Sequence, residues 1–96
     1  MREKCIEQKL VSAVKSARGL ALKLISPGFD GMPDRIILFS EGRIAFVEVK
    51  APGKTLRPLQ IKRKRQLEAL GFRVYCIDSM AQIQPMLSQI MDGGDA

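Results

Sequence analysis

The segment PDRIILFSEGRIAFVEVK, residues 33–50, contains two apolar runs, and the second of them ends in charged residues. Successive side chains of a strand point to opposite faces, so one face of this run carries Ile44, Phe46, Glu48 and Lys50, and the other carries Ala45, Val47 and Val49. Both faces are apolar enough to be covered, and we therefore expect Glu48 and Lys50 to be buried. Burial of a carboxylate and an ammonium costs several kcal/mol, which a partner, a metal or a reaction has to offset.

The turn between the two runs predicts which residues face each other. Runs 35–39 and 43–49 flank Ser40-Glu41-Gly42, which is typical of an antiparallel hairpin with a three-residue loop. With Glu41 at the centre, Asp34 opposes Glu48, and directly opposed Cβ atoms lie about 4.5–5.5 Å apart. Two carboxylates that close require a proton or a cation between them, and their oxygens suit Mg²⁺ or Mn²⁺. A bulge in the hairpin would shift this pairing by one residue.

Length, charge and composition restrict the class of protein. The 96 residues suit one domain with a modest core, residues 1–96, whose last five residues, DGGDA, we expect to be frayed. Sixteen Lys and Arg against ten Asp and Glu leave a net charge of +6, which favours a polyanionic partner, nucleic acid before membrane. The segment MREKCIEQKL lacks the apolar core of a signal peptide, and no apolar run is long enough to cross a bilayer. We therefore expect a cytoplasmic protein.

The chain contains no histidine, which excludes Ser-His-Asp and Cys-His nucleophiles and every nuclease chemistry that depends on histidine. Cys5 and Cys76 are too few for a zinc cluster, and we expect them to pack as small hydrophobic residues.

Hydrophobic periodicity and turn residues predict the other elements around the hairpin. A helix is expected over 3–17, a strand over 20–25, a second helix over 59–70 and a further strand over 72–77. Ser79 and Gln82 are spaced to cap a last helix, which Pro85 would kink or delay. The predicted fold class is α/β, a central mixed sheet with an antiparallel hairpin, flanked by helices.

Three motifs resemble those of a known family. GMPD before the hairpin, FVEVK at its end and LRPLQ at the start of a helix are similar to the VRR-NUC group of the PD-(D/E)xK nuclease superfamily. The resemblance runs from Glu7 to about Ser79 and implies a restriction-endonuclease-like core. It also implies that Asp34, Glu48 and the Val49 carbonyl hold the metal, and that Lys50 lies beside the attacking water. Glu7 matches the acidic residue of the family's first helix and Gln60 the glutamine of its second.

The same residues also have interpretations without catalysis. Asp34 could be a turn residue after Pro33, and Glu48 with Lys50 could form a structural ion pair. Glu3 lies on the same helical stripe as Glu7, and only the family pattern prefers Glu7. Gln60 could be an ordinary polar residue at the start of a helix.

Basic residues are concentrated after the hairpin. Between positions 50 and 65 there are seven of them and no acidic residue: Lys50, Lys54, Arg57, Lys62, Arg63, Lys64 and Arg65. On a helix, Arg63 and Lys64 would turn towards the Gln60 side, and Lys62 and Arg65 would turn outwards. Cations at this density neutralise phosphates without reading base sequence. With four Phe, one Tyr and no Trp, stacking of single strands is not expected, which favours duplex or branched DNA.

The sequence thus predicts a divalent-metal-dependent, structure-selective DNA endonuclease that acts on branched DNA such as four-way junctions. The alternative is a non-catalytic DNA-binding protein that retains the nuclease fold, and a small protein-interaction domain explains the charge pattern least well. A chain this small offers one active site, so the resemblance to junction-cleaving nucleases implies a homodimer. Residues near the C-terminus would either pack across the dimer or close the core of the monomer: Met80, Met86, Leu87 and Met91.

Overall fold

A computed structural model describes residues 2–92 of the chain as three α-helices and a four-stranded sheet. In chain order the elements are α1 (Glu3–Ser16), β1 (Leu20–Lys23), β2 (Arg35–Phe39), β3 (Arg43–Val49), α2 (Pro58–Ala69), β4 (Arg73–Ile77) and α3 (Ile83–Asp92). Short 3₁₀ turns, Ser40–Gly42 and Met80–Gln82, precede β3 and α3. The predicted mixed α/β fold is confirmed. Asp92 is the last residue of α3, and the rest of the predicted frayed end, 93–96, lies outside the described residues.

The sheet has the order β1-β2-β3-β4, and its register bears out the predicted hairpin. β2 and β3 are antiparallel and pair from Phe39 with Arg43 to Arg35 with Val47, without the bulge that would have shifted them. Glu41 and Gly42 turn the chain with φ of 66° and 70°. β4 lies parallel to β3 on the other side, so α2 is the crossover between them.

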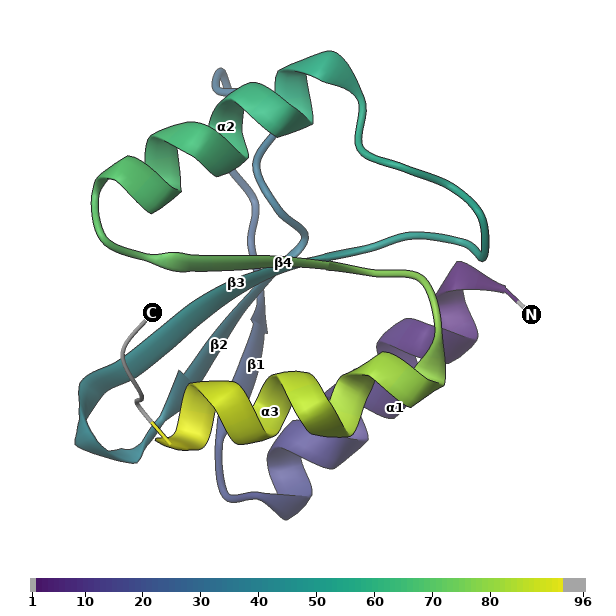
Figure 1. Ribbon diagram of the computed structural model, residues 1–96, viewed down its shortest axis with the longest axis vertical. Coiled ribbons are helices and arrows are strands. Elements are labelled where there is room, and N and C mark those ends of the chain that lie inside the picture. The colour runs from purple at the N-terminus through teal and green to yellow at the C-terminus, as the bar shows by residue number, and fades with distance from the viewer. Residues whose placement is uncertain (1, 93–96) are drawn as a thin grey trace.

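The helices form a layer on each side of the sheet (Figure 1). α1 and α3 cover one face and α2 covers the other. The alternation of β3 divides its side chains as predicted: Ala45, Val47 and Val49 lie in the main core with α1 and α3, whereas Phe46 packs with Leu67 of α2 and Val74 of β4 in a smaller core. Glu48 follows Phe46 by two residues and therefore points to the α2 side.

Buried stripes on α1 and α3 form most of the main core. Ile6, Leu10 and Val14 of α1 have no exposed surface. In α3, Met86 and Leu87 are 4% and 1% exposed, and Met80 and Met91 pack against the same core while remaining partly buried. Met80, Met86, Leu87 and Met91 therefore pack in or against the core of the monomer, which is one of the two roles left open for them. Within residues 2–92, none of the helices has the length and apolar character needed to span a bilayer.

Element ends differ from the predictions by one or two residues. β1 ends at Lys23 rather than Ile25, because the loop towards Pro33 starts earlier. α2 begins at Pro58, a residue well suited to the first helical position because it has no N–H to leave unpaired. The predicted cap is present: Gln82 Oε1 accepts a hydrogen bond from the Ser79 N–H at 3.1 Å, and α3 starts only after it.

Gly19 lies where α1 turns into β1 and leaves no room for a side chain. A Cβ there would lie 2.6 Å from a ring carbon of Phe39 and 2.7 Å from the Leu38 carbonyl oxygen. We expect Gly19→Ala to lower the free energy of unfolding by about 1–3 kcal/mol, measured by urea titration. The exposed Ser12→Ala is the control, with an expected change within about 0.5 kcal/mol. Equal stability of Gly19→Ala and the unmodified chain would contradict this packing.

Candidate active site

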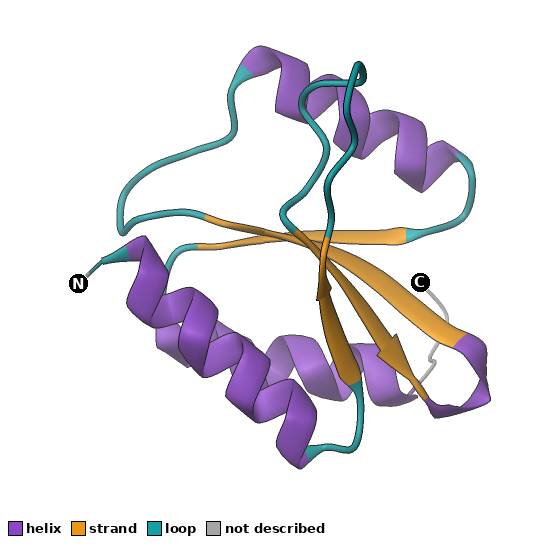
Figure 2. Cartoon of the chain, turned by 180° about the vertical axis from the view of Figure 1, so that it is seen from behind, coloured by secondary structure: helices purple, strands orange, loops and turns teal. Residues whose placement is uncertain are grey.

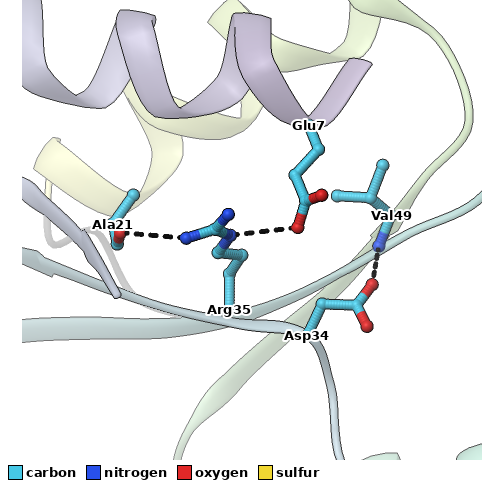
Figure 3. A network of polar contacts seen from close by, with 5 residues as sticks. All are labelled: Glu7, Ala21, Asp34, Arg35 and Val49. Carbon is cyan, nitrogen blue, oxygen red and sulfur yellow. Dashed lines mark hydrogen bonds and ion pairs between the residues drawn. The ribbon is translucent and has the colours of Figure 1, made fainter. Parts of the chain in front are cut away.

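Three carboxylates come together where β2 begins and β3 ends. Ligand oxygens of Glu3, Asp34 and Glu48 all lie within 4.8 Å of one another. Asp34 directly precedes β2 and Glu48 is the second-last residue of β3, so the hairpin register brings these two together as expected. Asp34 Oδ2 also accepts a hydrogen bond from the Val49 N–H at 3.1 Å, which joins the two strand ends (Figure 3). The third carboxylate comes from the first residue of α1, in the opposite layer.

Glu7 does not belong to this cluster, which corrects its assignment as the acidic residue of the first helix. Its Oε2 lies 3.1 Å from Arg35 Nε, and Arg35 also donates a hydrogen bond to the Ala21 carbonyl (Figure 3). Asp34 directly precedes Arg35 in extended chain, so the Arg35 side chain points to the α1 face while Asp34 points to the other. Glu3 lies one turn earlier, where α1 begins beside the end of β3, and can reach the carboxylates on the far face.

Glu48 is the buried member of the cluster. It is 5% exposed; its Oε2 accepts a hydrogen bond from Gln60 Nε2 at 3.2 Å and lies 3.5 Å from Lys50 Nζ. Its Oε1 is the one buried side-chain oxygen or nitrogen without a partner in the described part of the chain. The pKa of Glu48 is raised from 4.5 to about 7; burial is the largest cause, the charge of Asp34 adds to it, and Lys50 opposes it.

The donor set fits a hard divalent cation. All three side chains offer carboxylate oxygens, and one of these oxygens is buried and unsatisfied, a costly arrangement that a bound cation would relieve. Mg²⁺ and Mn²⁺ prefer such oxygen ligands. Val49 is fully buried and is tied to the cluster through its N–H; its carbonyl as a ligand stays a prediction.

Gln60 caps α2 and also contacts Glu48 of the acidic cluster. Its side chain is buried, and its Oε1 accepts a hydrogen bond from the Arg57 N–H at 2.9 Å, which caps α2. Its Nε2 holds Glu48 at the same time. A polar residue at the start of the helix is therefore also part of the candidate site.

The cluster opens into a surface cavity of about 590 Å³. Glu3, Asp34, Glu48, Lys50 and Gln60 all contribute to its wall. Two of the six residues predicted to bind DNA, Lys54 and Arg57, also line it. The cavity therefore places carboxylates, the Lys50 ammonium and further cations around one space.

The other four basic residues lie along α2. Lys62 and Arg65 are exposed, whereas Arg63 and Lys64 are half-buried, as the helical periodicity predicts. Lys64 pairs with Glu68 at 2.8 Å. Arg63 is held by the loop between β1 and β2, a contact that the sequence pattern did not indicate.

The raised pKa of Glu48 predicts a pH dependence of stability in EDTA. Below pH 4.5 the Glu48 carboxyl is neutral in both the folded and the unfolded state. Above pH 7 it is charged in both states, and only the folded state must bury that charge. The contribution of Glu48 therefore becomes unfavourable as pH rises from about 4.5 to 7, by on the order of 2 kcal/mol.

We expect Glu48→Gln to raise the melting temperature in EDTA at pH 8 by several degrees and to have much less effect at pH 5. Differential scanning calorimetry at both pH values measures this, with the exposed Glu68→Gln as control. A Glu48→Gln variant that melts lower than the unmodified chain at pH 8 would contradict a destabilising buried charge.

The mixed sheet, its covering helices and the acidic cluster beside Lys50 are the features of a nuclease domain, and comparison with known proteins agrees. The chain belongs to the VRR-NUC family, whose domain matches residues 3–81 and so includes the whole cluster. Putative nuclease p44 of Acyrthosiphon pisum secondary endosymbiont phage 1 is 46% identical over 79 residues, which cover 82% of this chain and 85% of that protein. A solved VRR_NUC domain structure superimposes with a TM-score of 0.85 over 92% of this chain and 97% of its own; at 23% identity it supports the fold.

Proposed function

We propose that this protein is a divalent-metal-dependent, structure-selective DNA endonuclease that hydrolyses phosphodiester bonds in branched DNA such as four-way junctions. One observation carries the proposal: the buried, unpartnered Oε1 of Glu48 lies in a cluster of three carboxylates directly beside Lys50. A purely structural ion pair would not need two further carboxylates gathered around it.

The metal ligands in this proposal are Asp34, Glu48, the Val49 carbonyl and, in place of Glu7, Glu3. A bound Mg²⁺ or Mn²⁺ would lower the pKa of water and neutralise charge on the scissile phosphate. Hydrogen bonds keep the two strand ligands in place, from the Val49 N–H to Asp34 and from Gln60 to Glu48. The ion pair between Glu7 and Arg35 anchors α1, and thereby Glu3, against the start of β2.

Lys50 and Gln60 act on the reacting groups. The Lys50 side chain is 14% exposed and borders the cavity, where its ammonium would stabilise negative charge on the attacking water and on the phosphate. Gln60 would orient the water or the substrate from the start of α2. Family membership favours in-line attack that leaves a 5′-phosphate and a 3′-hydroxyl.

The basic residues position the DNA backbone. Lys54 and Arg57 border the cavity and would hold the phosphates next to the scissile one. Lys62 and Arg65 extend this positive surface along the exposed side of α2, and Arg63 and Lys64 add charge beside it. Contacts of this kind are sensitive to salt and do not select a base sequence.

The experiment is cleavage of end-labelled linear, nicked, flapped, forked and four-way DNA of matched sequence in Mg²⁺, Mn²⁺ or EDTA. We expect metal-dependent cutting of the branched DNAs at least several-fold faster than of the linear duplex. Equal rates on all five substrates would remove structure selectivity from the proposal. Retention of DNA without cutting in either metal would favour a DNA-binding protein instead.

We further propose that the protein acts as a homodimer in the cytoplasm of a bacterial or phage-infected cell. Since the C-terminal methionines lie in the core, the apolar surface available to a second copy is elsewhere. Leu20, Leu22 and Ile44 are 58%, 45% and 37% exposed, and the register places them on the sheet face that carries Phe46, beyond the cover of α2. Light scattering should give about twice 10.7 kDa, and Leu22→Lys should give the monomer. A monomeric unmodified chain at assay concentration would contradict the dimer.

A further inference from the structure

Phe29 is the most exposed aromatic residue within residues 2–92 and belongs to neither hydrophobic core. Phe39 and Phe46 are buried, and Phe72 packs edge-on against Phe46 with 5.6 Å between ring centroids. Tyr75 donates a hydrogen bond to Gln89. Phe29, by contrast, lies in the loop between β1 and β2 and is 45% exposed.

The exposed ring of Phe29 is nevertheless held in place. The guanidinium carbon of Arg63 lies 3.7 Å from the ring centroid, and Arg63 Nε donates a 2.7 Å hydrogen bond to the Asp30 carbonyl. The Phe29 N–H donates to the Ser26 carbonyl at 3.1 Å. Arg63 therefore covers one face of the ring, and 45% of the residue stays exposed to solvent.

The loop brings this ring close to the candidate active site. In Figure 2 the loop rises from the ends of β1 and β2 and lies beside α2. Gly31 packs so tightly on the first turn of α2 that a Cβ there would lie 2.7 Å from Leu59 Cγ, and its φ of +89° also favours glycine. Gly31 and Gln60 border both the 590 Å³ cavity and a neighbouring hollow of about 510 Å³ between the loop and the start of α2.

A DNA strand that leaves the cavity along this hollow would reach Phe29 after a short distance. Arg63 is three residues beyond Gln60 on α2, about 4.5 Å along the helix axis. Because Gln60 lines the cavity, the ring on Arg63 lies within a few nucleotides of it at a rise of about 3.4 Å per nucleotide. Arg57 lines both the cavity and the hollow and can neutralise the phosphate between them, although Asp30 contributes one negative charge to the loop.

We propose that Phe29, backed by Arg63, is a stacking platform for one unpaired nucleobase of the DNA substrate. The inference rests on the proposed nuclease function and narrows its substrate to DNA with an unpaired or unstacked nucleotide a few positions from the cut. A fixed aromatic face with an arginine behind it, near a hollow that Arg57 lines, suits the binding of an unpaired base. The small number of aromatic residues argued against an extended stacking surface. The loop between β1 and β2 provides a single platform.

The test measures binding without cleavage, in EDTA. The probes are two DNAs of the same sequence with 2-aminopurine at one position, which is unpaired in a single-nucleotide bulge and paired in the control duplex. Phe29→Ala should weaken binding to the bulged DNA about 5- to 100-fold and binding to the duplex less than about twofold. Quenching of 2-aminopurine by stacking should be lost in Phe29→Ala and in Phe29→Leu, and kept in Phe29→Tyr. Arg57→Ala should weaken binding to both DNAs alike.

The outcomes separate the platform from the nuclease function. An unchanged ratio of affinities for bulged and paired DNA in Phe29→Ala, or unchanged quenching in Phe29→Leu, would overturn the platform alone. Phe29→Leu keeps the apolar bulk of the loop, so a folded Leu variant decides the question even if Phe29→Ala unfolds. An unmodified protein that binds neither DNA at low salt would overturn the proposed function and the platform with it.

Discussion

Replacement of Lys50 by methionine should lower the rate of DNA cleavage by about 10²- to 10⁴-fold. Methionine keeps most of the length of the side chain and removes the ammonium, which lies 3.5 Å from Glu48 Oε2 and is 14% exposed. The charge that the ammonium would stabilise develops on the attacking water and the phosphate oxygens, so its loss affects the transition state more than DNA binding. Single-turnover cleavage of a labelled four-way junction in Mg²⁺ measures the effect.

The matched control is Lys54→Met, because Lys54 lines the same cavity and is exposed. We expect it to weaken DNA binding modestly and to reduce the salt dependence by about one phosphate contact, with the bound-state cleavage rate within a few-fold of the unmodified chain. Lys50→Arg should recover little activity, since a planar guanidinium does not reproduce a compact ammonium. A Lys50→Met variant that cuts within a few-fold of the unmodified chain would exclude Lys50 from the reaction.

Asp34→Asn should weaken binding of Mn²⁺ by at least about 10- to 100-fold and abolish cleavage at low metal concentration. Asparagine retains an oxygen that can accept the hydrogen bond from the Val49 N–H, so the strand ends should remain joined. The substitution removes the negative charge of Asp34 from the cluster that it forms with Glu3 and Glu48. Calorimetric titration of the DNA-free protein with Mn²⁺ measures metal affinity independently of activity.

Glu3→Gln and Glu7→Gln form a matched pair for the same titration. Both residues lie on α1 one turn apart, but the carboxylate of Glu3 is in the cluster and that of Glu7 is on Arg35. We expect Glu3→Gln to weaken Mn²⁺ binding and Glu7→Gln to leave it nearly unchanged at a small cost in stability. The opposite result would restore Glu7 as the ligand that the family pattern indicated.

Strand periodicity and turn length were sufficient to predict the centre of the fold. Two apolar runs around a three-residue turn allow one register that buries both sets of side chains, and this register brings Asp34 next to Glu48. Alternation along β3 also placed Phe46 and Glu48 on one covered face, and both side chains are buried there. These contacts depend on residues close in sequence or on alternation alone.

Contacts between layers could not be predicted in this way. Glu3 and Glu7 share one helical stripe. The choice between them depends on where α1 begins relative to the sheet and on Arg35, which forms an ion pair with Glu7. The loop that places Phe29 on Arg63 has no periodicity that would indicate its path. The C-terminal methionines were compatible with a core or an interface. An apolar stripe on a helix indicates that the stripe is buried, but it does not indicate which surface packs against it.

The most direct test of metal-dependent DNA cleavage uses a labelled four-way junction and the unmodified protein. Metal is first removed with EDTA, and Mg²⁺ is then titrated back. We expect no cleavage in EDTA, cleavage that rises with Mg²⁺ to a plateau, products with 5′-phosphate ends, and no recovery in Lys50→Met or Asp34→Asn. Cleavage that continues in EDTA, or DNA that stays bound and uncut at every Mg²⁺ and Mn²⁺ concentration, would contradict this expectation.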